Sequence, residues 1–168
     1  IPGITALTDK QLRNRNTYPE SWDFDTVWTL SKGGYVYPAL CDVDFLMVRG
    51  TEINPFVIAD QNDYANISVN GLDKYYVLKS DITLTNHTPI SNFNGKFNGN
   101  GYTVKITGNG GLFASTLSSS VVENVVVEGT ISGSAAISAV NSGSIINCIN
   151  NAAVSGGGKV GGIAGESL

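Results

Sequence analysis

The sequence predicts an all-β fold, a right-handed parallel β-helix (solenoid) of at least three coils. One five-residue motif occurs three times, as GGLFA at 110–114, AAISA at 135–139 and GGIAG at 161–165. A second motif, VENV at 122–125, returns as IINC at 145–148. Short strand-like runs broken by Gly, Ser and Asn, repeated at a period of about 23 to 26 residues without helical spacing, are typical of stacked β coils.

The composition excludes several classes of protein. The chain has 168 residues, a net charge of -4 and no basic cluster, which argues against a nucleic-acid partner. No apolar run approaches the ~20 residues that a membrane-spanning helix needs. Twenty glycines with only 14% charged residues favour β structure with tight corners. Because Ile1 is neither an initiator methionine nor part of a signal sequence, we expect a fragment or a processed product.

We place a domain boundary near residue 50, between a helix-plus-hairpin tail or linker module (1–50) and a β-solenoid with an N-terminal cap (51–168). In the first module, a threonine and a glutamine three positions apart form a capping box, which predicts a helix over 8–16. The turn SKGG then separates candidate hairpin strands at 27–30 and 35–37.

The solenoid needs a lid, because its first coil otherwise exposes unpaired backbone and an apolar cross-section. Asp60 can cap a short helix in which Tyr64 and Ile67, three positions apart, form one apolar face. We therefore expect a helical cap ahead of the coils. The strands around it are expected at 55–58, 75–78 and 81–84.

Apolar residues at equivalent coil positions are predicted to stack inward. By their spacing, Val104 corresponds to Val125, and Val125 to Cys148, at offsets of 21 and 23 positions. Cys148 lies far from Cys41 and shows no CxxC spacing, so we interpret it as a buried free thiol. The predicted core also includes Val122 with Ile145, and Leu112 with Ile137 and Ile163.

Sharp corners must join these short strands. Asn124 and Asn147 share one coil position, so their amides can stack and bond backbone groups left unpaired at a bend. We therefore predict an asparagine ladder along the corner. Positive φ angles are expected at glycines where a Cβ would clash. These are Gly99, Gly101, Gly108, Gly129 and Gly143.

Several motifs add a family resemblance. FNGKFNGNGYTVKI at 93–106 looks like the FxGxFxGNGYTI run that precedes repeats of the GLUG type. GLFA at 111–114 resembles their GLFG element, IINCIN at 145–150 their INCxN coil, and VGGIAG at 160–165 their VGGLAG. Such repeats belong to bacterial surface proteins, including large adhesins and the amino-terminal regions of some immunoglobulin A metallopeptidases. The resemblance covers residues 55–168 and implies a β-solenoid at the bacterial cell surface. It supplies no active site.

The sequence offers no convergent catalytic, cofactor or metal site. GxGxxG at 156–161 lacks the strand, helix and acid of a dinucleotide fingerprint, and no GGxGxD calcium repeat is present. His87 is the only histidine and stands in a polar run, so we interpret it as a loop residue. Glu123 and Glu128 are five positions apart in strand-rich sequence. We therefore expect them on opposite faces, which disfavours a carboxylate pair for glycoside chemistry.

These observations favour a non-catalytic, extracellular structural or adhesive module of a larger bacterial surface protein. Two alternatives stay open, a module that binds host or cell-wall polysaccharide through its coil faces and a carbohydrate-active β-helix enzyme. Residues 160–164 begin a coil that the sequence to Leu168 does not complete, so an open end is expected. Further coils of the parent chain are the expected partner. The alternative partner is a neighbouring copy joined head to tail, whose Trp22, Phe24 and Trp28 would supply apolar side chains to cover the open end.

Overall fold

A computed structural model describes residues 28–30, 38–40 and 49–168 of the chain. The helix that the sequence predicts at 8–16 lies outside the described residues. The chain divides into two compact units, residues 1–48 and 49–168.

The described part of the first unit is a two-stranded antiparallel sheet of β1 (Trp28–Leu30) and β2 (Pro38–Leu40). The second strand begins at Pro38, whereas the sequence predicts a strand at 35–37, a segment outside the described residues. Proline is tolerated as the first residue of a strand, where its missing N–H costs no ladder hydrogen bond.

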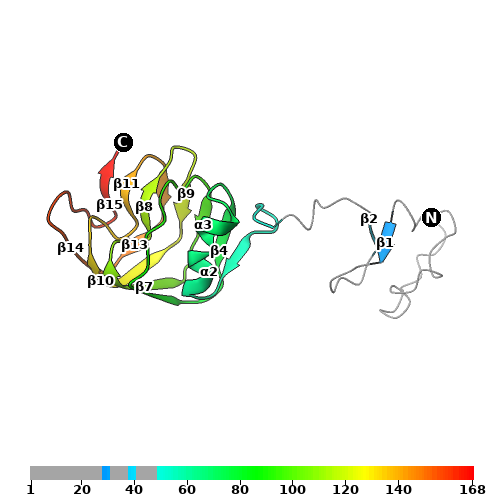
Figure 1. Cartoon of the computed structure of the whole chain (residues 1–168), viewed down its shortest axis with the longest axis horizontal. Coiled ribbons are helices and arrows are strands. Elements are labelled where there is room, and N and C mark those ends of the chain that lie inside the picture. Colours follow the sequence, from blue (N-terminus) through cyan, green and yellow to red (C-terminus); the bar gives the residue numbers. More distant parts are fainter. Residues whose placement is uncertain (1–27, 31–37, 41–48) are drawn as a thin grey trace. The chain divides into compact units, whose positions relative to one another are not determined.

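Residues 49–168 form a parallel β-solenoid of about five turns, which confirms the predicted fold class (Figure 1). Three sheets run along the stack. The first contains β3 (Phe56–Ile58), β4 (Tyr75–Leu78), β6 (Lys96–Asn98), β9 (Val121–Glu123) and β12 (Ser144–Ile146). The second contains β5 (Ile82–Thr85), β7 (Thr103–Asn109), β10 (Val126–Ser132), β13 (Ile149–Asn150) and β14 (Ala153–Ser155). The third contains β8 (Phe113–Thr116), β11 (Ser138–Asn141) and β15 (Ala164–Ser167).

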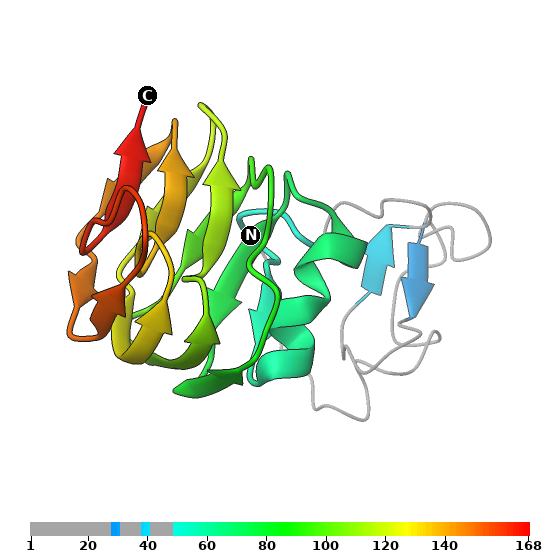
Figure 2. The ribbon, with the colours of Figure 1, turned by 60° about the vertical axis from the view of Figure 1, so that its left-hand side comes forward.

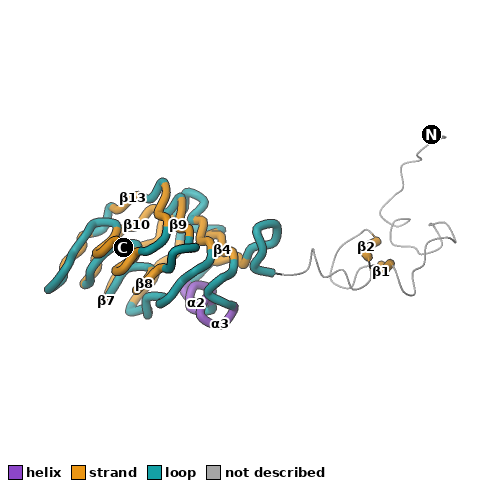
Figure 3. The backbone as a smooth tube through the Cα atoms, turned by 90° about the horizontal axis from the view of Figure 1, so that it is seen from above, coloured by secondary structure: helices purple, strands orange, loops and turns teal. Residues whose placement is uncertain are grey.

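Successive coils lie side by side in register, as the stacked strands of Figure 3 show. Within a strand, alternate side chains face the interior. In β5, for example, Ile82 and Leu84 are buried while Thr83 and Thr85 are exposed. Of the predicted core residues, five are fully buried: Val104, Leu112, Val122, Val125 and Ile137. The other three, Ile145, Cys148 and Ile163, are half-buried and pack against the core.

The register confirms one predicted correspondence and corrects another. Val122 pairs with Ile145, as the sequence predicts. Val104, however, pairs with Val127 and not with Val125, so the predicted offset of 21 positions is wrong. Between the first and second sheets, four residues (99–102) form the corner of one coil and two (124–125) that of the next. The number of residues between positions paired on neighbouring coils therefore differs from sheet to sheet, and the value for one sheet does not predict the value for the next.

The interior changes along the stack from aromatic to small side chains. Near the cap, ring pairs fill the core, with centroids 5.5 Å apart for Phe56 and Tyr76 and 4.7 Å apart for Phe93 and Phe113. Stacked rings at these centroid distances attract one another beyond the effect of their burial. In later coils Phe113 is followed in register by a serine and then an alanine. The coils near the cap therefore bury the larger side chains.

Two short helices, α2 (Gln61–Ala65) and α3 (Ile67–Asn70), lie at the end of the stack beside β3 and β4 (Figure 2). The helical cap that the sequence predicts is confirmed, although the chain divides it into two helices. Asp60 is the N-cap of α2, and its carboxylate accepts the amides of residues 62 and 63 at 2.8 and 2.9 Å. Tyr64 and Ile67 are both buried.

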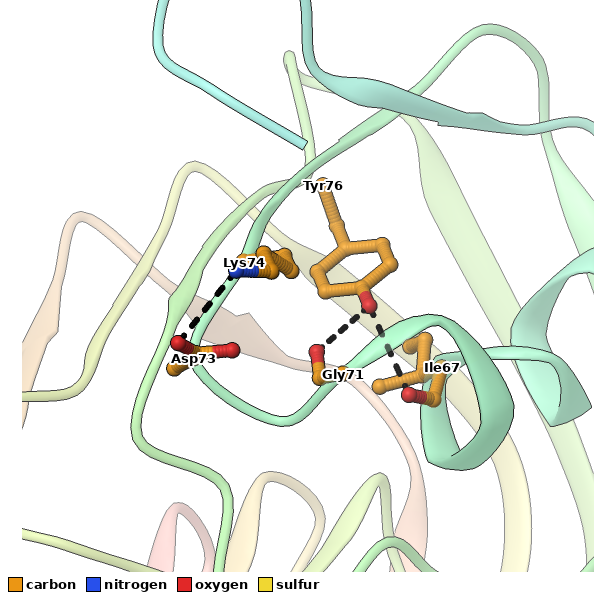
Figure 4. A network of polar contacts seen from close by, with 5 residues as sticks. All are labelled: Ile67, Gly71, Asp73, Lys74 and Tyr76. Carbon is orange, nitrogen blue, oxygen red and sulfur yellow. Dashed lines mark hydrogen bonds and ion pairs between the residues drawn. The ribbon is translucent and has the colours of Figure 1, made fainter. Parts of the chain in front are cut away.

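A tyrosine from the first sheet fastens the cap (Figure 4). The Tyr76 hydroxyl donates to the carbonyl of Gly71 at 2.6 Å and lies 3.4 Å from that of Ile67. Gly71 is the C-cap of α3, where helix carbonyls lack intrahelical partners, whereas the Ile67 carbonyl already accepts the Gly71 amide. Burial, and secondly the charge of Asp73, raises the pKa of Tyr76 to about 12, so the hydroxyl stays a donor at neutral pH.

Val125→Asp is expected to lower the free energy of unfolding by several kcal/mol, because an unpaired carboxylate would enter a fully buried position. Lys105→Ala, an exposed change on β7, is the control and should have little effect. Urea denaturation of both variants tests this. Equal midpoints for Val125→Asp and the parent chain would contradict the inward position.

Candidate functional site

The corner between the first and second sheets is built from asparagines. Among the described residues, every non-glycine residue with a positive φ is an asparagine. Three of them, Asn100, Asn124 and Asn147, lie at this corner, and the other two are Asn86 and Asn92. Asparagine is the side chain that best tolerates the left-handed region, because its short amide bonds nearby backbone. Two of the five, Asn124 at φ 55° and Asn147 at φ 52°, are the residues for which the sequence predicts a ladder.

Side-chain amides join three coils at this corner, and those of Asn124 and Asn147 bond other amides where the sequence predicts bonds to backbone groups. The Nδ2 of Asn147 donates to the Oδ1 of Asn124 at 2.7 Å. The Nδ2 of Asn124 donates in turn to the Oδ1 of Asn98 at 3.2 Å. Asn98 donates to the carboxylate of Glu123 at 2.8 Å, and its Oδ1 also accepts the backbone amide of Asn100. The asparagine ladder, defined as Asn98, Asn124 and Asn147, thus runs from coil to coil in one direction.

Glycines at the corners have two different roles. Gly101, Gly108 and Gly129 have positive φ, as predicted. Gly99 and Gly143 do not, and for them the prediction is wrong. A Cβ at Gly99 would lie 2.4 Å from the carbonyl oxygen of the neighbouring coil, and one at Gly143 would lie 2.1 Å from a serine hydroxyl. These two glycines permit close approach between coils.

A shallow groove of about 350 Å³ follows the asparagine ladder. We call it the asparagine groove. Its lining combines backbone and amide groups with two aliphatic side chains that are neighbours in register. The lining residues are Asn100, Gly101, Asn124, Val126, Asn147 and Ile149.

His87 lies in a loop, as predicted, but the sequence gives no sign of its burial. Its ring meets Tyr64 of the cap edge to face, and its Nε2 donates to the carbonyl of Gly111 at 2.9 Å. The Tyr64 hydroxyl donates to the carbonyl of Leu112. Burial lowers the pKa of His87, and the hydrogen bond to Gly111 offsets this in part. Among the described residues, nothing forms a hydrogen bond with the buried Nδ1.

The carboxylates that the sequence singles out do not converge. Glu123 lies on the first sheet, directly after the buried Val122. Glu128 lies on the second sheet, directly after the buried Val127. Both face outward on different sheets, so the predicted alternation across one strand is wrong. Asn124 turns the chain between them. Glu128 pairs in register with Lys105, whereas Glu123 accepts the Asn98 amide.

The GxGxxG run at 156–161 lies in the loop between β14 and β15, so a strand does precede it, contrary to the prediction. A strand therefore follows it, where the dinucleotide fingerprint needs a helix. Within the described ranges, no three His, Cys, Asp or Glu side chains form a group that could hold a metal ion.

Cys148 carries a free thiol that is half-buried. Burial raises its pKa, which keeps the thiol protonated and unreactive at neutral pH. Cys41 lies outside the described residues.

Comparisons with protein-family models, with curated proteins and with solved structures gave no match. The helices described at 61–70 are too short to cross a membrane, and the structure shows no other helix in the described residues.

Substitution of Asn124 tests the ladder. Asn124→Ala should cost about 2–4 kcal/mol of unfolding free energy, because it removes two amide hydrogen bonds and forces alanine into a positive φ. Asn124→Gly keeps the corner conformation and should cost roughly half as much. Asn151→Ala, at an exposed position of a later coil, is the control. If all three variants unfold at the same urea concentration, the ladder makes no contribution.

Acidification should weaken the cap contact at His87. Its pKa is lowered in the folded chain from the ordinary 6.5, so below pH 6.5 the unfolded chain binds more protons. The contribution of His87 to the free energy of unfolding should be fully present above about pH 6.5. Below that pH it should fall by at most about 1.4 kcal/mol per pH unit, until the pKa of His87 in the folded chain is reached. Urea midpoints at pH 5, 6 and 7 measure this. His87→Gln should remove the dependence, and an unchanged profile in that variant would assign it to other groups.

Proposed function

We propose that this chain is a non-catalytic structural module of an extracellular bacterial surface protein, in which it extends or displays other parts or adheres to a surface. The observation that carries the proposal is the continuous stack from the helical cap through the last coil. Inward side chains and corner amides in this stack serve contacts between coils. The resemblance to GLUG repeats supports the location at the cell surface.

The last described coil is the suggested contact with a partner. Its strands β12 to β15 pair on one side only within residues 49–168, and its inward residues Ile145 and Ile163 are half-buried. Strand edges of this kind accept further strands in register. Further coils of the parent chain suit this edge, as does a neighbouring copy joined head to tail. At the opposite end, α2 and α3 occupy the place of a coil.

Sedimentation of the purified chain over a concentration series, together with a product assay on polymeric glycans, tests this function. Association that increases with concentration and an absence of product are the expected results. Release of sugar ends that is lost in Glu123→Gln or Glu128→Gln would show an enzyme instead. A monomer at every concentration would remove the neighbouring copy as a partner.

A second function, binding of polysaccharide without cleavage, is favoured by the asparagine groove. Its amides offer hydrogen bonds to hydroxyl groups, and its aliphatic side chains offer an apolar surface. Glycan-array binding of the intact chain tests this function, with no retained glycan as the result against it.

A further inference from the structure

We propose that the asparagine groove binds an extended, uncharged polysaccharide that lies along the stack axis. The proposal rests on the second function above and names its site and class of ligand. It depends on three properties of the groove: side-chain amide groups with unused hydrogen-bonding capacity, two aliphatic side chains, and backbone amides at Gly101, Asn124 and Ile149 that already pair between coils.

The ladder leaves amide groups available for a ligand. Each asparagine amide has two N–H donors and an oxygen acceptor. Asn124 and Asn147 each use one Nδ2 hydrogen in the ladder. Within residues 49–168, the Oδ1 of Asn147 accepts no hydrogen bond, and this residue is exposed. The groove can therefore both donate to and accept from hydroxyl groups.

Two aliphatic side chains also line the groove. Val126 pairs in register with Ile149, so their outward side chains lie on neighbouring coils, about 4.8 Å apart. Ile149 is 53% exposed although it is a large apolar residue. A row of aliphatic side chains beside a row of amides matches the C–H and O–H groups of a sugar chain. Both kinds of side chain recur on two neighbouring coils, and Thr103 takes the place of Val126 on the coil before. A ligand with repeated units is therefore complementary to the groove.

Backbone pairing disfavours a peptide in the same groove. The amide of Asn124 donates to Ile146, that of Gly101 to Asn124, and that of Ile149 to Val125. These three amides are thus used between coils, which leaves side chains to recognise a ligand there. A peptide strand needs unpaired backbone groups for strand addition, whereas hydroxyl groups are bound well by side-chain amides.

Charge favours a neutral chain over a polyuronate. No charged side chain of residues 49–168 lines the groove, and Glu123 lies beside it with its carboxylate bonded to Asn98. The protein has a net charge of -4. An anionic polymer would be repelled, with no cation in the lining to compensate.

Calorimetric titration of the full 168-residue chain with cellohexaose, mannohexaose and laminarihexaose tests the site, with oligogalacturonate as the charged comparison. Ile149→Lys replaces one of the two aliphatic side chains with a charged one. Ile146→Lys is the matched control, because Ile146 belongs to the same coil, is 51% exposed and faces outward from the first sheet. Circular dichroism verifies that both variants fold.

The expected result is binding of at least one neutral oligosaccharide, weakened about tenfold or more by Ile149→Lys and little changed by Ile146→Lys. Equal binding by both variants and the parent would place the ligand elsewhere, which overturns this site and leaves the second function intact. Absence of binding to every neutral probe at millimolar concentration would overturn both. Stronger binding of oligogalacturonate than of the neutral probes would overturn the assignment of an uncharged ligand.

Discussion

The structure depends on hydrogen bonding in register between parallel coils. Each coil must return to the same position, about 4.8 Å further along, before its strands can pair. The strands are short, so the corners determine whether this return succeeds. Asparagines in the left-handed region and glycines that permit close approach provide the corners. The same asparagines then bond to one another, which couples the geometry of a corner to the stacking of the next coil.

The sequence predicts much of this arrangement because the repeat is local. The motif at 110–114, 135–139 and 161–165 corresponds to the observed register of the third sheet, in which Phe113, Ser138 and Ala164 are neighbours. The cap also follows from local chemistry, since Asp60 satisfies the first amides of α2 and Tyr64 faces the interior. The structure places Asn124 and Asn147 in bonding distance.

Other features depend on contacts with distant parts of the chain and could not be predicted from the sequence. The offset of Val104 is set by two extra residues in one corner, and repeat spacing in another sheet carries no information about them. The burial of His87 depends on where the cap helix lies, and its polar neighbours in sequence point to the surface. At Gly99 the decisive contact is with the adjacent coil, while its own φ is ordinary.

The change of the interior from aromatic to small side chains has a consequence for the order of folding. Neighbouring coils are close in sequence, so a solenoid can nucleate in one place and extend coil by coil. The coils with Phe93, Phe97 and Phe113 gain the most from burial, and Tyr76 fixes the helices against them. Nucleation at the cap end would let each later coil form on a template that already exists. Slow amide exchange should then be concentrated near the cap, with faster opening toward β15.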